Sequence, residues 1–186
     1  INILSSLYLK SKNLENKMQE FNKVTLETID TTGIMRLNDP DAMNAVSDEM
    51  LDGLWSCLNE VENSKSNIKC LVITGEGRGF CAGANLSGGS DRSNTGRQDA
   101  GHRLETSYHP ILRRIKNLKI PMITSVNGPA AGVGMSLALM GDIILAGKSA
   151  FFLQAFRRIG LVPDGGSTWL LPRLVGMARA KELAIL

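Results

Sequence analysis

The fold of this chain is decided by one stretch, Ile120-Pro121-Met122-Ile123-Thr124-Ser125-Val126-Asn127-Gly128-Pro129-Ala130-Ala131-Gly132-Val133-Gly134-Met135-Ser136-Leu137-Ala138-Leu139-Met140-Gly141-Asp142. Its first part, residues 120–126, is apolar and rich in β-branched side chains, which predicts a strand. Asn127-Gly128 ends that strand. The apolar run at 137–140 then predicts a helix. Strand, tight turn and buried helix therefore succeed one another without a long loop.

The turn residues Ala131-Gly132-Val133-Gly134 have almost no side-chain bulk. One interpretation is that the glycines only let the helix pack closely on a neighbouring strand. The other is that they let a ligand oxygen with negative charge approach the free N–H groups at the helix start. A dinucleotide-binding fingerprint is rejected, because Leu137 stands where the third glycine of that motif should be.

Composition excludes several other classes of function. The chain has 186 residues, 43% of them hydrophobic and 21% charged, as expected for one globular domain with a full core. Its net charge is only +3, and its basic pairs lie beside apolar residues at helical spacing, so no nucleic-acid partner is expected. No apolar run approaches the roughly 20 residues that cross a bilayer, so no membrane partner is expected either.

The cysteines and histidines point to a reducing, cytoplasmic location and to no metal site. Cys57, Cys70 and Cys81 are an odd number without a C-x-x-C spacing, which indicates free thiols. With only His102 and His109 beside them, they match no recognised metal-ligand spacing. Both histidines fall on a predicted helix, where a surface or core position is expected rather than catalysis.

The two ends of the chain set the expected domain boundaries. Residues 1–17 form no pattern that joins them to the strand predicted at 23–29, so we expect an N-terminal extension outside the fold and a core at residues 18–186. A helix predicted at 178–186 runs to the last residue without a capping signal. We therefore expect the chain to be truncated at this end.

Strands alternate with helices along the core, which predicts right-handed β-α-β units. We expect strands at 23–29, 34–37, 68–74, 120–126, 143–146 and 151–153, and helices at 48–62, 104–118 and from 167 or 168 onward. The first two strands form a hairpin, and Ser47 is a suitable N-cap for the first helix. The polar segment 87–101 is predicted to be a mobile lid or loop.

Four segments in this order and spacing resemble the enoyl-CoA hydratase/isomerase superfamily, over about residues 23–186. They are Asn38-x-Pro40-x-x-x-Asn44-Ala45, Gly79-Phe80-Cys81-Ala82-Gly83-Ala84-Asn85-Leu86, residues 121–142, and residues 151–173. The resemblance implies an α/β fold, the crotonase-like spiral of ββα units. It also implies an acyl-CoA substrate, in which coenzyme A is part of the substrate and no separate cofactor is used. A homotrimer or hexamer is implied for the full-length protein, together with a C-terminal helical segment that we expect to be largely missing from this chain.

The resemblance further implies an oxyanion hole made by the backbone N–H groups of Ala84 and Val133. Such donors stabilise the negative oxygen of a thioester enolate, and backbone donors suit segments with small side chains. The residues that the resemblance places against the coenzyme A part of the substrate are Ala82, Gly83, Asn85, Leu86, Gly132 and Gly134.

The chain departs from typical hydratases of this superfamily at two positions. Ser136 and Phe156 stand where hydratases carry two glutamates, and neither side chain is a general acid or base at neutral pH. Asp164 instead matches the aspartate of the isomerase branch typified by phenylacetate degradation, which shuttles a proton along the acyl chain. Pro163-Asp164-Gly165 is also a common turn signal, so a purely structural Asp164 is the alternative.

From this resemblance we expect an isomerase that moves a double bond in an enoyl-CoA through an enolate, with Asp164 as the catalytic residue. Two alternatives stay open at this point. One is an enoyl-CoA hydratase with an unusual water activator, and the other is a non-catalytic acyl-CoA-binding protein with the same fold.

Overall fold

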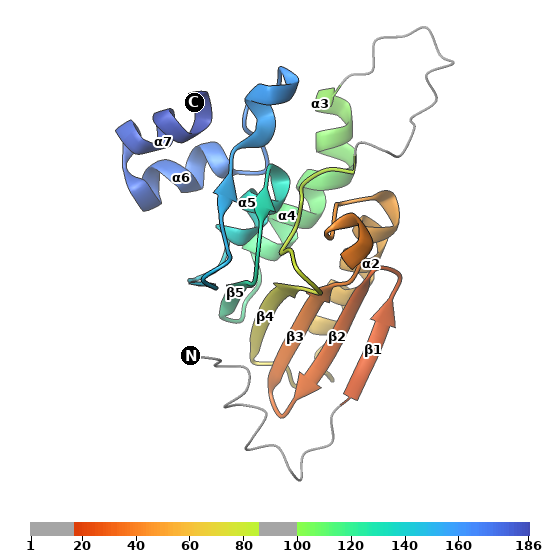
Figure 1. Cartoon of the computed structure of the whole chain (residues 1–186). Coiled ribbons are helices and arrows are strands. Elements are labelled where there is room, and N and C mark those ends of the chain that lie inside the picture. The colour runs from red at the N-terminus through yellow and green to blue at the C-terminus, as the bar shows by residue number, and fades with distance from the viewer. Residues whose placement is uncertain (1–16, 86–99) are drawn as a thin grey trace, which may run out of the picture.

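A mixed sheet in the order β1-β2-β3-β4-β5-β7 forms the body of the molecule in the computed structural model, which describes residues 17–85 and 100–186 (Figure 1). Its strands are β1 (Lys17–Phe21), β2 (Val24–Ile29), β3 (Thr32–Leu37), β4 (Cys70–Gly75), β5 (Met122–Val126) and β7 (Ile143–Ala146). The first three are antiparallel, and β3, β4, β5 and β7 are parallel. The predicted hairpin and the predicted β-α-β units are thus confirmed.

A second layer of short extended segments lies beside the large sheet. β6 (Ala130–Ala131) pairs in parallel with β8 (Phe152–Leu153). Single parallel bridges join Val46 to Ala84 and Cys81 to Ala130. Each turn of the chain therefore contributes one long strand to the large sheet and one short segment to the second layer, which is a spiral of repeated units.

Helices connect the strands and cover the sheet. They are α2 (Asp48–Val61), α3 (Ala100–Arg103), the π-helical turn η2 (Leu104–Tyr108), α4 (His109–Lys116), α5 (Val133–Ala138), α6 (Ser167–Val175) and α7 (Met177–Ile185), with 3-10 turns η1 (Pro40–Ala42) and η3 (Ala155–Ile159). In Figure 1, α6 and α7 lie side by side, on the far side of the molecule from β1.

Helix α2 shows why these elements form where they do. The Ser47 Oγ accepts a hydrogen bond from the Met50 N–H at 3.2 Å, as predicted for its N-cap, and Asp48 and Glu49 follow in the first turn. The apolar side chains of the helix recur on one face and are buried in the main core, together with those of β2 to β5. They are Met50, Leu51, Leu54, Cys57, Leu58 and Val61.

The structure differs from the sequence-based expectations at the N-terminal end of the core. Strand β1 begins at Lys17, within the segment expected to lie outside the fold, and residues 1–16 lie outside the described residues. The sequence does not reveal this strand, because its side chains are mostly exposed and carry little apolar pattern. Most of the predicted lid at 87–101 also lies outside the described residues.

Two helices start differently from the prediction. The helix expected at 104–118 already begins with α3 at Ala100, inside the predicted lid, and α3 leads directly into the π-helical turn η2, which the apolar spacing does not reveal. Helix α6 has Gly166 at its N-cap rather than Ser167 or Thr168. The Ser167 hydroxyl instead donates to the Asp164 carbonyl oxygen at 2.9 Å, so it stabilises the preceding turn.

Replacing Ser47 by alanine should lower the free energy of unfolding by about 1 kcal/mol, because the cap to the Met50 N–H is lost. The measurement is the urea midpoint of the purified protein. The matched control is Ser56→Ala, an exposed position inside the same helix, where alanine favours the helix and the change stays within about 0.5 kcal/mol. Equal midpoints for the two variants would contradict the capping role.

Replacing Gly134 by alanine should destabilise the fold by about 1–3 kcal/mol through overpacking. A Cβ at this position would lie 2.4 Å from the Cys81 carbonyl oxygen, so α5 must move away from its neighbour. At Gly147 the nearest atom would be 3.5 Å from an added Cβ, and Gly147→Ala is the control, expected to leave the urea midpoint unchanged or slightly raised. An unchanged urea midpoint for Gly134→Ala would contradict this prediction, because it would show that the chain accommodates the added methyl group beside Cys81 without loss of stability.

Candidate active site

Two glycine-containing segments meet at the end of the second layer, although Gly83 and Gly132 are 49 positions apart in the sequence. Gly83 has φ +97° and Gly132 has φ +52°, values that side chains rarely allow. A Cβ on Gly83 would lie 2.9 Å from the Ala131 carbonyl oxygen and 3.8 Å from the Gly132 Cα. The structure therefore brings together the two segments that the sequence singled out, and it does so backbone against backbone.

Backbone hydrogen bonds hold both segments in place. The Gly83 carbonyl accepts from the Val46 N–H at 2.7 Å, and the Cys81 carbonyl accepts from the Ala131 N–H at 2.9 Å. The Gly132 N–H donates to the Leu153 carbonyl at 3.0 Å. Each segment is thus paired to its neighbour in the spiral, which makes the junction rigid.

The N–H groups of Ala84 and Val133 lie next to these glycines. Val133 is the first residue of α5, so its N–H has no partner within the helix. Within residues 17–85 and 100–186, neither amide donates any of the backbone hydrogen bonds that join loops, turns and caps. The arrangement leaves two backbone donors beside one junction, where an oxygen with negative charge can accept from both.

The other residues predicted to contact coenzyme A have mixed surroundings. The N–H groups of Ala82 and Asn85 already donate to the carbonyls of Met43 and Val46, at 2.9 and 3.0 Å. Gly134 packs against Cys81, the close-packing use of glycine that the sequence left open. Leu86 lies outside the described residues. Contact of these residues with coenzyme A stays a prediction.

Asp164 is anchored through its main chain to α5 and α6. Its carbonyl oxygen accepts from the Ser136 Oγ at 2.9 Å and from the N–H of Ser167 at 3.0 Å. A Cβ on Gly165, which has φ +60°, would lie 2.9 Å from the Ser136 Cβ. Ser136 lies on α5, three residues after Val133. It therefore holds the Asp164 turn against α5, and it does so through the Asp164 backbone rather than through the carboxyl group.

The Asp164 carboxyl group is half-buried, and its Oδ1 atom is buried without a hydrogen-bond partner among the described residues. Burial raises the pKa of Asp164 above its ordinary value, and the charge of His109 opposes this rise. A buried carboxyl oxygen without a partner is unfavourable for the charged form. Perturbed groups of this kind cluster at functional sites.

Apolar side chains border the Val133 side of the junction. They enclose a cavity of about 20 Å³ between α2, α4 and α5. Its walls are Val46, Leu51, Leu54, Tyr108, Ile111, Leu112, Ile115, Val133 and Leu137. With almost no polar wall, this cavity is a dry environment in which nearby hydrogen-bond donors act more strongly.

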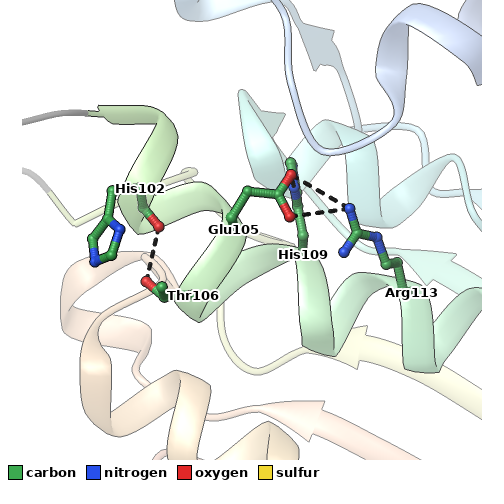
Figure 2. Close-up of polar contacts among 5 residues, drawn as sticks. All are labelled: His102, Glu105, Thr106, His109 and Arg113. Atoms are coloured by element: carbon green, nitrogen blue, oxygen red, sulfur yellow. Dashed lines mark hydrogen bonds and ion pairs between the residues drawn. The ribbon is translucent and has the colours of Figure 1, made fainter.

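The two histidines differ in their surroundings, as Figure 2 shows. His102 is exposed, and its carbonyl oxygen accepts a hydrogen bond from the Thr106 hydroxyl at 2.9 Å. His109 is hydrogen-bonded to Glu105 and influences Asp164 electrostatically. Sequence reasoning does not connect His109 with Asp164, because they are 55 positions apart and no local motif joins them.

No group of three or more potential metal ligands occurs among residues 17–85 and 100–186. Over the same part of the chain, no helix is both long enough and apolar enough to cross a bilayer.

Comparisons with known proteins identify the family of this chain. The enoyl-CoA hydratase/isomerase family model matches residues 27–186. A 1,2-epoxyphenylacetyl-CoA isomerase of Escherichia coli K12 is 47% identical over 152 residues, which cover 82% of this chain and 58% of the relative. A probable enoyl-CoA hydratase of Rhodobacter capsulatus is 38% identical over 169 residues, covering 89% and 62%. The chain thus spans about three fifths of the length of these relatives.

Solved structures show the same fold. The crystal structure of an enoyl-CoA hydratase/isomerase from Cupriavidus metallidurans superposes with a TM-score of 0.79 at 36% identity, over 89% of this chain and 61% of the other. That of an enoyl-CoA hydratase from Polaromonas gives 0.74 at 36% identity, over 87% and 62%. The spiral of ββα units is the crotonase fold, and the chain belongs to the enoyl-CoA hydratase/isomerase family.

Proposed function

We propose that this protein is an enoyl-CoA isomerase, which moves a double bond in an enoyl-CoA or a related ring-derived acyl-CoA. One observation carries the proposal: Asp164 lies on a turn hydrogen-bonded to α5, its carboxyl group is half-buried, and its buried Oδ1 atom has no hydrogen-bond partner among the described residues. The first turn of α5 also carries the Val133 N–H. The similarity to a protein named as a 1,2-epoxyphenylacetyl-CoA isomerase supports the same class of reaction.

In the proposed reaction, the thioester oxygen accepts hydrogen bonds from the N–H groups of Ala84 and Val133. As a proton leaves the carbon next to the thioester or conjugated with it, negative charge moves onto that oxygen. Preorganised donors lower the energy of this enolate, and losing one such donor typically costs about 10²–10³ in rate. Backbone donors paired into the spiral need no rearrangement when the charge develops.

Asp164 is the proposed base and acid of this cycle. Its carboxylate takes a proton from one carbon of the acyl chain and returns it to another, so the double bond moves and no proton is gained or lost. Burial, which raises the pKa of Asp164, makes the group a better proton carrier near neutral pH. The apolar cavity beside Val133 keeps this side of the junction dry.

A hydratase is a weaker proposal for this site. Ser136 is fully buried, and its hydroxyl donates to the Asp164 carbonyl oxygen, so it holds the turn instead of activating water. Phe156 is buried, and its ring lies 3.8 Å from where a Cβ on Gly132 would be. Neither Ser136 nor Phe156 carries a carboxyl group. A proton shuttle by Asp164 therefore fits this site better than the addition of water with the help of two carboxyl groups.

Assembly and location are further parts of this proposal. Helices α6 and α7 expose large apolar side chains such as Trp169, Leu174 and Met177, at 61%, 52% and 59% of their possible area. Surfaces of this kind favour association, in line with the expected homotrimer or hexamer. The free thiols of Cys57, Cys70 and Cys81 fit the expected cytoplasmic location.

Replacing Asp164 by asparagine should lower kcat for isomerisation by about 10²–10⁴, because the amide cannot carry the proton. Binding of an acyl-CoA ester, measured by calorimetry, should be retained, since the backbone donors are unchanged. Asp52→Asn, at an exposed position on α2, is the matched control and should keep the parent rate. A wild-type rate for Asp164→Asn would refute the assignment.

Two incubations in deuterium oxide, one with a 3-enoyl-CoA and one with a 2-enoyl-CoA, separate the three candidate functions. An isomerase should give the 2-enoyl product with deuterium on the carbons that exchange protons, detected by mass spectrometry and NMR. A hydratase acting on a 2-enoyl-CoA would give 3-hydroxyacyl-CoA. If a bound ester acquires no deuterium and no product forms, the protein is a binding scaffold and the proposal fails.

A further inference from the structure

Two asparagine side chains hold the loop that leads from β4 to the Ala84 segment. The first is Asn44, which is fully buried. Its amide nitrogen donates to the carbonyl oxygens of Glu76 and Gly79, both at 2.9 Å, although these residues lie 32 and 35 positions further along the chain. Its Oδ1 atom accepts from the Asp39 N–H at 2.8 Å. Both donors of this amide are therefore engaged, and its orientation is fixed.

The second side chain, Asn127, reaches the same loop from a different turn of the spiral. Its amide nitrogen donates to the carbonyl oxygens of Gly77 at 2.9 Å and Gly79 at 3.2 Å. Its Oδ1 atom accepts from the Gly75 N–H at 3.2 Å. A reversed amide would place an oxygen against carbonyl oxygens, so this side chain also has one favourable orientation.

The peptide group between Gly79 and Phe80 is consequently fixed at both of its polar atoms. Its oxygen accepts one hydrogen bond from each asparagine, which uses both lone pairs of the carbonyl. Its N–H donates to the Pro129 carbonyl oxygen at 3.0 Å. Three turns of the spiral, which are far apart in the sequence, are thus tied together at one peptide group.

This peptide group is connected to the Val133 donor through the turn at residues 127–129. The turn supplies both Asn127 and the Pro129 carbonyl, and Val133 begins α5 four residues after it. A Cβ on Gly128 would overlap with the Arg78 carbonyl oxygen, so the turn lies on the loop backbone against backbone. A shift of the turn would therefore move the Val133 N–H as well.

The Ala84 donor is connected to the same peptide group through Asn44. Residues 43–46 run beside residues 82–85, and backbone hydrogen bonds of 2.7 to 3.0 Å join the two stretches. Asn44 lies within the first stretch, where its left-handed backbone, with φ +57°, turns the chain. The stretch that carries Ala84 is therefore paired with the stretch whose side chain holds the Gly79 carbonyl.

We propose that Asn44 and Asn127 are positioning residues for the oxyanion hole of this site. By holding the Gly79 carbonyl between them, they set the separation and direction of the two backbone donors, Ala84 and Val133. The consequence for the reaction rate rests on the proposed function, whereas the effect on a bound thioester carbonyl does not. The inference gives two buried amides a role in the chemistry without making either of them a donor to the substrate.

The main test uses Asn127→Asp in the protein as it stands. The carboxylate still accepts from the Gly75 N–H, but it cannot donate to the carbonyls of Gly77 and Gly79. The probe is a saturated acyl-CoA with carbon-13 at the thioester carbonyl, observed by infrared difference spectroscopy. In the parent protein the carbonyl band should lie below its frequency in solution, because two donors polarise the bond. In Asn127→Asp it should move back toward the solution frequency.

Kinetics separate positioning from a loss of stability. In Asn127→Asp, kcat for isomerisation should fall by about 10²-fold, as expected when groups at the reacting centre are misplaced by about 1 Å. The Kd for the saturated ester, measured by calorimetry, should stay close to that of the parent protein. A purely structural role would lower the urea midpoint and leave both the carbonyl band and kcat of the folded protein unchanged, and this result would overturn the proposal.

A second variant, Asn44→Asp, tests the other side of the Gly79 carbonyl. Aspartate tolerates the left-handed backbone and keeps an acceptor for the Asp39 N–H, so the lost donors are the main change. If the variant folds, its band should move in the same direction, and the double variant should lose less rate than the product of the two single losses, because both act through one peptide group. A full product would overturn the shared role. If it does not fold, Asn127→Asp decides alone.

The matched control is Asn67→Asp, at an exposed asparagine whose φ is also left-handed, +53°. It should keep the band and the rate of the parent protein, and an equal shift in this control would overturn the proposal. A parent protein that lowers the carbonyl frequency but moves no double bond would refute the proposed isomerase. The positioning role would then still stand if Asn127→Asp raised that frequency.

Discussion

The site depends on a close contact between two pieces of backbone. Gly83 and Gly132 meet with no side chain between them, and a methyl group on Gly83 would lie 2.9 Å from a carbonyl oxygen of the other segment. This contact places the Ala84 amide and the start of α5 at one junction. Gly134 serves the same end further along α5, because any larger residue there would push the helix away from Cys81. The glycines therefore serve two purposes. Gly83 and Gly132 let the two backbone segments come close together, and Gly134 lets α5 pack closely enough to hold them there.

Polar groups around this junction are used for positioning more than for chemistry. Ser136 stands where a hydratase glutamate is expected, and its hydroxyl ties the Asp164 turn to α5. Asn44 is fully buried and donates to the carbonyls of Glu76 and Gly79, so it holds the loop that leads into residues 80–85. Buried amides and hydroxyls of this kind are tolerated because each is hydrogen-bonded. The Asp164 carboxyl group is the contrast, since one of its oxygens is buried without a partner among the described residues.

This contrast links the structure to the proposed chemistry. A half-buried carboxyl group is sensitive to nearby charges: burial raises the pKa of Asp164, and an electrostatic interaction with His109, on a different element of the fold, opposes this rise. The hydratases of the family and the present chain share the fold, and we infer that they differ in which side chains surround the junction. Function within such a family is decided by a few side chains on a common backbone.

Much of the fold could be predicted from the sequence, because local signals and the global structure agree. The hairpin, the Ser47 cap, the parallel strands and the strand-turn-helix at residues 120–142 follow from periodicity, capping and glycine placement, and the structure confirms them. Strand β1 and the π-helical turn η2 could not be predicted, since neither has a distinctive pattern of apolar residues. The sequence by itself also indicated Asp164, Ala84 and Val133 as candidates through their motifs.

Only the tertiary structure decided how these candidates relate to one another. The meeting of Gly83 with Gly132, the tether from Ser136 to Asp164 and the influence of His109 on Asp164 all join residues far apart in the chain. Spacing along a sequence carries local information such as helix faces and turns. Contacts between distant segments depend on how complete helices and strands pack, and burial and electrostatic interactions arise only once that packing exists.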